Sequence, residues 1–503
     1  MLLPLTVKRL FLVILTVLTL IPLLSSLWAS FQEPQIQGRL ELYQTNLVLE
    51  ATEYDRDSAA TTSPEGIATL VEQLTGEDPY GNAIKQYESV LESSNTQLDV
   101  LNERAATAKA PATAKAIAET TTLIDELHVK LGILYAVNDQ ISKAKEQWQQ
   151  IAADDQTYAS LIAVLEPLWL EGKASESAVT ILGDRLETWF QQQNLQQFFQ
   201  VIGAEQDLAL LQESIQYEAQ QAFLKLTVVT ILPFSVGIFG FGLLIFLVIQ
   251  FVRKRQDSLL FADNTAAWET PWDGEIIWQV FIVGFFFVGQ LLLPLVLPNL
   301  LQSLNLNAAS WTVRGKAAYT LATYFMMAIA GILVLVASIW KFRPLPKNWF
   351  QIKWLDNWTV WGFGGYMVAL PLVLIVSLIN QQIWQGQGGS NPILFLALKA
   401  QDQVALTIFF MTASVLAPLY EEIMFRGFLL PSLTRYLPVW GSIVLSAFLF
   451  AIAHLSLSEV LPLMTLGIIL GFVYTKSKNI LAPMLLHSLW NSGTLLSLFI
   501  LGS

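Results

Sequence analysis

Nine long apolar runs constrain the fold of this 503-residue chain more than any other feature. Each run is long enough, or nearly so, to cross the hydrocarbon core of a bilayer as a helix, the only open-chain conformation that satisfies its own backbone hydrogen bonds in lipid. An apolar fraction of 54% and a charged fraction of 14% are typical of membrane proteins. We therefore predict an all-α, polytopic helical membrane protein with about nine spans. The runs cover residues 10–28, 226–252, 276–297, 317–340, 358–379, 404–420, 439–456, 460–475 and 480–501.

The first apolar run follows Lys8 and Arg9 and is long enough to cross a membrane. A signal peptide would have a similar composition, but Leu27-Trp28-Ala29 is a poor match to the small-x-small pattern of a cleavage site. We therefore predict that residues 1–28 are an uncleaved N-terminal signal anchor, with a cleaved signal peptide as the alternative.

Residues 29–225 have a different composition from the rest of the chain. They carry 30 acidic and 12 basic side chains, whereas the remainder carries 10 and 16. They are rich in Gln, Glu and Ala, with little alternation of the kind that marks strands, which predicts an acidic, soluble helical domain between the first two spans. An acidic domain does not fit nucleic acid as a partner. The chain has no cysteine, which excludes disulfides, zinc–thiolate sites and a cysteine nucleophile.

Two stretches of this domain share a spacing typical of the tetratricopeptide (TPR) repeat, a helix–turn–helix unit of about 34 residues. Repeats of this kind stack to form a groove for a peptide or protein, so the spacing predicts a protein partner for the 29–225 domain. An ordinary helical hairpin that packs its own core explains the same spacing equally well. The first stretch has Leu131, Gly132, Tyr135, Ala144 and Trp148, and the second has Leu165, Trp169, Ala178 and Leu182.

Lysine and arginine concentrate on one side of a nine-span arrangement. The positive-inside rule then puts the N-terminus in the cytoplasm and the 29–225 domain outside it. Residues 226–400 form further membrane-spanning helices, and residues 401–503 form a C-terminal core. The basic groups on the favoured side are Lys8-Arg9, Arg253-Lys254-Arg255, residues 341–353, Arg426 with Arg435, and Lys476 with Lys478.

Ionisable side chains are unusually frequent in this C-terminal core. Each costs roughly 2.5–3.5 kcal/mol at the centre of a membrane helix, so each calls for a function or a partner. Glu421-Glu422 precede Arg426, Phe450 precedes His454, and His487 precedes Asn491. Two of the three histidines of the chain are in this set, and the third, His128, is in the acidic domain.

The spacing of these residues separates two roles for the adjacent glutamates. Glu422 and Arg426 are four residues apart, as are His487 and Asn491, so each pair shares a face of its helix. Glu421 lies about 100° further around the helix from Glu422 and can face another direction. One glutamate can therefore be neutralised by arginine while its neighbour serves as a general base.

The ordered set Glu-Glu-x-x-x-Arg, Phe-x-x-x-His and His-x-x-x-Asn on successive apolar runs resembles the CPBP family of membrane proteins. This family includes the type II CAAX prenyl endopeptidases, bacteriocin-processing and immunity proteins, and Abi-type proteins. The resemblance covers residues 400–501, and all three motifs match. It implies hydrolysis of a peptide bond in a membrane-associated peptide or protein.

The resemblance also implies a role for each motif residue. Glu421 would activate a water molecule with help from His454, and His487 with Asn491 would stabilise the oxyanion. Arg426 would pair with Glu422 and hold the helix, with Phe450 as a further supporting residue. A metalloprotease is the alternative, because Glu421, His454 and His487 are ligand types that zinc accepts. We favour catalysis without a metal or other cofactor, since the chain has no His-Glu-x-x-His and the three donors come from separate spans.

Two other functions compete with proteolysis. A non-catalytic scaffold or immunity-type protein could retain the same motifs, and buried polar residues can simply hold membrane helices together. A proton-coupled transporter could relay protons through Glu421 and His454, although we find no internal duplication of the sequence. No sequence feature identifies the natural substrate or a prenyl group on it, the membrane, or the oligomeric state.

Overall fold

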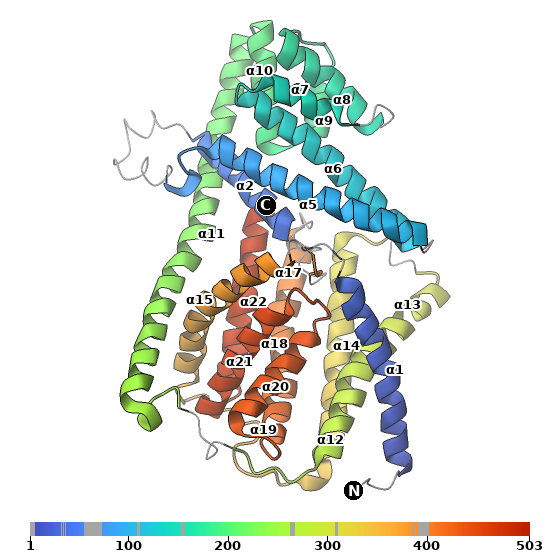
Figure 1. Cartoon of the computed structure of the whole chain (residues 1–503), viewed down its shortest axis with the longest axis vertical. Coiled ribbons are helices and arrows are strands. Elements are labelled where there is room, and N and C mark those ends of the chain that lie inside the picture. The colour runs from blue at the N-terminus through green and yellow to red at the C-terminus, as the bar shows by residue number, and fades with distance from the viewer. Residues whose placement is uncertain are drawn as a thin grey trace. The chain divides into compact units, whose positions relative to one another are not determined.

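The computed structural model describes residues 6–502 except 32, 34, 36, 55–72, 108–110, 152–155, 262–266, 307–309, 385–386 and 391–401. Within these residues, all the secondary-structure elements are helices (Figure 1). Eight of the helices are long and apolar enough to cross a membrane. The prediction of an all-α, polytopic membrane protein is therefore confirmed. The remaining predicted run, residues 439–456, forms α20 (Val439–Ile452), whose 14 residues make it shorter than the other spans.

The chain divides into two compact units, one of residues 37–232 and one of residues 1–36 with 233–503. The unit of residues 37–232, which we call the soluble unit after the sequence prediction, is built from helices around one apolar core that includes Leu131, Trp148, Leu165 and Trp189. Its helices are α2 (Gln37–Thr52), α5 (Pro79–Thr107), α6 (Pro111–Val137), α7 (Ile141–Gln149), α8 (Gln156–Glu166), the π-helix η1 (Pro167–Glu171), α9 (Ala178–Arg185), α10 (Thr188–Ile202) and the first part of α11 (Glu205–Lys254).

The residues with TPR-like spacing lie on two successive helix pairs of the soluble unit. In the first pair, α6 and α7 approach so closely that a Cβ atom on Gly132 would lie 2.1 Å from Nε1 of Trp148. In the second pair, Leu165 and Leu182 are fully buried between the α8–η1 segment and α9. Both pairs are explained by core packing within helical hairpins, and the assignment to a repeat family stays a prediction.

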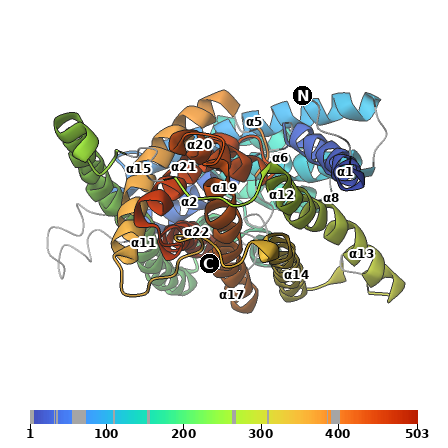
Figure 2. The ribbon, with the colours of Figure 1, turned by 90° about the horizontal axis from the view of Figure 1, so that it is seen from below.

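The membrane unit contains the remaining helices. Figure 2 shows α1 (Val7–Ser30) beside the segment that runs from α12 (Gly274–Gln279) to α13 (Leu293–Ser303). The middle of this segment, η4 (Val280–Leu292), packs against α1. The other helices of the unit are α14 (Val313–Ile339), α15 (Trp358–Trp384), α17 (Gln403–Met411), η7 (Thr412–Leu416), α18 (Ala417–Glu422), η8 (Ile423–Leu429), α19 (Leu430–Leu433), α20, α21 (Val460–Ser477) and α22 (Leu481–Gly502), with the second part of α11.

Several of the basic residues used for the orientation contact the part of the membrane unit where α12 begins. Lys8 and Arg9 both form ion pairs with Glu275 at the start of α12. Arg435 donates a 2.5 Å hydrogen bond to the carbonyl of Trp272, just before the same helix. These contacts place the bases at one end of the membrane unit, while the side of the membrane that this end faces stays a prediction.

Candidate active site

Glu421 and Glu422 lie on α18, a six-residue α-helical turn between two π-helical segments. Within this span the backbone changes from the π-helix η7 to α18 and then to the π-helix η8. Short π-helical segments inside longer helices are frequent at functional sites. The glutamates therefore sit at the most irregular part of an otherwise continuous membrane helix.

Pro418 contributes to this irregularity because proline has no backbone N–H. Carbonyl groups one turn before it lose a donor within their own helix, and buried carbonyls in a membrane need another partner. Two side chains of α22 donate to carbonyls there. Asn491 Nδ2 lies 2.7 Å from the oxygen of Ala413, and Ser488 Oγ lies 2.5 Å from that of Ser414. These bonds join α22 to the helix that carries Glu421.

Glu422 forms a buried polar cluster with Arg426 and His487. Its Oε1 atom accepts hydrogen bonds from Arg426 Nη1 and His487 Nδ1, each at 2.8 Å. Glu422 and Arg426 are both completely buried. Arg426 also donates from Nη2 to the carbonyl of Gly467 at 3.3 Å, which joins this cluster to α21. An arginine so fully engaged is a structural cation and is not available to a substrate.

Phe450 lies against the three charged or titratable groups around it. The Arg426 guanidinium lies 4.3 Å from the centroid of its ring. The rings of His454 and His487 pack edge-on to it, with centroid distances of 4.9 and 5.7 Å. The phenylalanine ring therefore packs against all three groups and helps to fix their positions.

Glu421 faces away from this buried cluster. Its Oε1 accepts a 2.5 Å hydrogen bond from the Tyr324 hydroxyl on α14, and its Oε2 lies 3.9 Å from His487 Nε2. Oε2 has no hydrogen-bond partner in the structure. Glu422 Oε2 likewise has no partner, but Glu422 is completely buried beside Arg426, whereas Glu421 lines a cavity.

Tyr324 was not identified from the sequence. The available signal was a hydroxyl group within the apolar run 317–340, and such a group needs a partner in the membrane. Tyrosines are common in membrane helices near the interface, so the signal was weak. Only packing of α14 against α18 brings the hydroxyl to Glu421.

His454 is oriented by the last turn of its own helix. Its Nδ1 lies 2.9 Å from the carbonyl oxygen of Phe450. Because a carbonyl oxygen can only accept, Nδ1 carries the proton. In a neutral ring Nε2 is then an acceptor, which is the state a general base requires.

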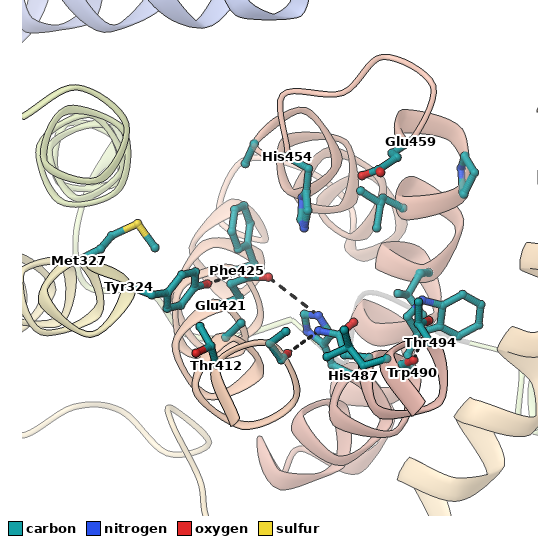
Figure 3. A pocket seen from close by; sticks show the side chains of 18 of the residues that line it. Tyr324, Met327, Thr412, Glu421, Phe425, His454, Glu459, His487, Trp490 and Thr494 are labelled. Carbon is teal, nitrogen blue, oxygen red and sulfur yellow. Dashed lines mark hydrogen bonds and ion pairs between the residues drawn. The ribbon is translucent and has the colours of Figure 1, made fainter. Parts of the chain in front are cut away.

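These residues surround a cavity of about 340 Å³ (Figure 3). All four side chains predicted to be catalytic line it, namely Glu421, His454, His487 and Asn491. The three predicted supporting residues, Glu422, Arg426 and Phe450, do not line it and lie in the buried cluster behind Glu421 and His487. The rest of its wall is mostly apolar and includes Phe285, Met327, Phe425, Leu463 and Trp490, with Glu459 at the start of α21.

A metal ion would need several donors converging on one point. Within the described part of the chain, no three His, Cys, Asp or Glu side chains form such a group. Nδ1 of His487 is already engaged by Glu422, and Oε1 of Glu421 by Tyr324. These bonds leave Glu421 Oε2 and His487 Nε2 unused and 3.9 Å apart, but His454 does not join them in one group, so we derive no step through zinc and the absence of a metal stays a prediction.

Comparison with known proteins identifies the membrane core. The family model of the type II CAAX prenyl endopeptidase Rce1-like proteins matches residues 403–493. The "Membrane-embedded CAAX protease MroQ" of Staphylococcus aureus is 22% identical over 43% of this chain and 87% of its own length. The "Putative membrane peptidase YdiL" of Bacillus subtilis is 25% identical over 33% of this chain and 67% of its own length. The "UPF0177 protein YxdF" of Lactococcus lactis is 26% identical over 32% of this chain and 88% of its own length. No solved structure matches the chain.

The helical membrane unit and these relatives together support a multi-pass integral membrane protein of the protease class. More specifically, residues 403–493 are similar to the type II CAAX prenyl endopeptidases, which supports the assignment of this core to the CPBP family.

Proposed function

We propose that this protein is a membrane-embedded endopeptidase that cleaves a peptide bond in a membrane-associated peptide or protein. The observation that carries the proposal is the position of Glu421 Oε2, which lacks a hydrogen-bond partner beside a cavity also lined by His454, His487 and Asn491. A carboxylate oxygen, two imidazoles and an amide are the groups that water activation and oxyanion stabilisation require.

In the proposed reaction, Glu421 accepts a proton from a water molecule whose oxygen attacks the carbonyl carbon of the scissile bond. His454 assists through Nε2, because the Phe450 carbonyl holds the ring proton on Nδ1. Collapse of the tetrahedral intermediate breaks the C–N bond, and the proton held by Glu421 passes to the departing amine. The Tyr324 hydroxyl, bound to the other oxygen of Glu421, orients the carboxylate.

The oxyanion of the intermediate is stabilised by His487 and Asn491. In its protonated form, His487 donates from Nδ1 to Glu422 and presents Nε2–H to the cavity. Asn491 uses one N–H for the Ala413 carbonyl and keeps its second for the substrate.

Two wider parts of the proposal concern substrate delivery. The soluble unit of residues 37–232, which carries the TPR-like helix pairs, presents substrate or recruits a protein partner. The bias of lysine and arginine places the N-terminus in the cytoplasm and this unit outside it. The cleaved substrate need not be prenylated, since only the family resemblance points to that modification.

The function is tested by comparing new protein N-termini in membranes from cells that express the wild-type chain, Glu421→Gln or Tyr324→Phe. We expect Glu421→Gln to abolish a defined set of cleavages, with a loss of at least about 100-fold for a general base. Tyr324→Phe should retain partial activity, because it removes an orienting bond and leaves the carboxylate. Cleavage products that are identical in wild-type and Glu421→Gln membranes would contradict the proposal and favour a scaffold.

Two further arms of this experiment separate the alternatives. A chelator such as 1,10-phenanthroline should leave the Glu421-dependent cleavages unchanged, whereas their loss, with recovery on added zinc, would favour the metalloprotease. A chain lacking residues 40–215 should cleave a short peptide copied from an identified site but no longer select the intact protein. If selection of the intact protein survives the deletion, the recruitment role is wrong.

A further inference from the structure

The segment that follows His454 is held by polar contacts from three distant parts of the membrane unit. Residues 453–459 connect α20 to α21, and two residues of this connection, His454 and Glu459, line the cavity. The segment is therefore the part of the cavity rim on which the position of His454 depends. The helix ends at Ile452 and Leu455 has a positive φ of 59°. The segment's own backbone bonds are short turns, such as Leu455 N–H to the Ile452 carbonyl and Glu459 N–H to the Ser456 carbonyl, so contacts from outside add to what holds it.

The first contact comes from the end of the N-terminal helix. Ser30, the last residue of α1, lies more than 400 residues away in sequence, yet its Oγ accepts a 3.2 Å hydrogen bond from the backbone N–H of Leu457. The chain just beyond Ser30 is also engaged, since the Glu33 carbonyl accepts a 2.9 Å bond from the Gly389 N–H.

The second contact comes from the segment after α15. Ser458 donates from Oγ to the Gly389 carbonyl at 2.6 Å and from its backbone N–H to the Gly388 carbonyl at 3.1 Å. Gly388 and Gly389 have φ values of 101° and 74°, which residues other than glycine rarely adopt. A Cβ atom on Gly388 would also lie 2.7 Å from Cβ of Ser458, so this approach requires glycine.

The third contact comes from α15 itself. Asn380, near its end, donates from Nδ2 to the Ser458 carbonyl at 2.6 Å. Ser30, Asn380 and Ser458 are all buried. Burial makes each of these bonds costly to break, because the separated partners have no water to replace them. We call Ser30, Asn380, Gly388 and Gly389, with their bonds to residues 457–458, the rim clasp.

We infer that the rim clasp is a positioning device for the active site, in which Ser30, Asn380 and Ser458 fix the rim and hence the approach of His454 to a substrate. This inference rests on the proposed function. It assigns α1 a second role besides anchoring, because a helix cleaved and released near residue 29 could no longer hold Ser30 in the clasp.

The clasp is tested first without reference to activity. The chain has no cysteine, so the thiol introduced by His454→Cys is the only one present, and its rate of maleimide labelling reports on the rim. Adding Ser458→Ala should speed labelling several-fold. Adding Ser442→Ala should not, because Ser442 is an equally buried serine whose hydroxyl bonds only carbonyls at the start of α20. Equal labelling rates in the Ser458→Ala and Ser442→Ala backgrounds would overturn the inference.

The second test uses a peptide whose cleavage depends on Glu421. Ser458→Ala and Asn380→Leu should each lower kcat by about tenfold or more and leave KM within about twofold, since misplacing a catalytic group by ~1 Å can cost 100-fold in rate. Ser30→Ala removes the bond from the Leu457 N–H and the hydroxyl's own bond to the Leu27 carbonyl within α1, and it serves if the other variants do not fold. A matching fall in the Ser442→Ala chain would show general destabilisation and overturn the inference. If no Glu421-dependent cleavage exists, the proposed function fails, and the labelling test alone decides the clasp.

Discussion

At the scale of single residues, the site separates charges that stabilise the fold from a charge left for chemistry. Glu422 and Arg426 are both completely buried and share hydrogen bonds with His487 and Gly467. Glu421, the residue before Glu422, is 13% exposed and lines the cavity. A single step along the helix therefore divides a structural carboxylate from the one we propose to be catalytic.

The buried pair makes a prediction about stability. Arg426→Met should lower the free energy of unfolding by about 3–5 kcal/mol, because it leaves Glu422 charged in an apolar interior. The double change Glu422→Leu with Arg426→Met should be less destabilising than Arg426→Met alone, since no unpaired carboxylate remains. Thermal unfolding in detergent, followed by tryptophan fluorescence, measures both. A double variant less stable than Arg426→Met would show that the pair does not act through charge compensation.

At the scale of elements, α15 approaches α21 and α22 so closely that side chains are excluded from part of its surface. A Cβ atom on Gly365 would lie 2.5 Å from Leu486 Cδ1 on α22 and 2.8 Å from Val473 Cγ2 on α21. Leu486 directly precedes His487, so the packing of α15 sets the position of this histidine. The adjacent Gly364 has open space at the same position.

This pair of glycines provides a matched test of helix packing. Gly365→Ala should destabilise the membrane unit by about 1–3 kcal/mol through overpacking. It should also reduce Glu421-dependent cleavage, because α22 must move. Gly364→Ala introduces the same methyl group on the same helix and should change neither property. Melting temperature and cleavage rate are measured side by side. Equal effects of the two changes would mean that helix propensity, and not the close approach, is responsible.

At the scale of the whole molecule, the open question is the side of the membrane on which each part lies. Single cysteines answer it directly, since the natural chain has none. In intact cells, a membrane-impermeant maleimide should label Ser89→Cys in α5 of the soluble unit and Leu306→Cys after α13. It should label Asp356→Cys, in the loop before α15, only after lysis. All three positions are exposed. Labelling of Asp356→Cys alone in intact cells would invert the orientation, and the unmodified chain supplies the background.

Proteolysis in lipid requires that water and polar groups be gathered in one sheltered place. The membrane unit is formed by residues 1–36 together with residues 233–503, on either side of the soluble unit in the sequence. Its cavity is lined by residues of η4, α14, α18, α21 and α22, among others. The soluble unit is inserted between the first span and all the others. It can therefore be enlarged or replaced during evolution without interrupting the helices that carry the candidate site.

The helical membrane architecture follows from local features of the sequence, because a run of apolar residues must form a helix in lipid whatever it later packs against. Glu421, His454, His487 and Asn491 also stood out locally, since polar groups in such runs are costly and need a purpose. Other features depend on contacts between residues far apart in the chain. The Tyr324 bond to Glu421, the support of Pro418's helix by Asn491, and the hold of Ser30 on the rim beside His454 arise only when the helices pack. Hydropathy records what each residue costs in lipid, but only the packed helices determine which partners offset that cost.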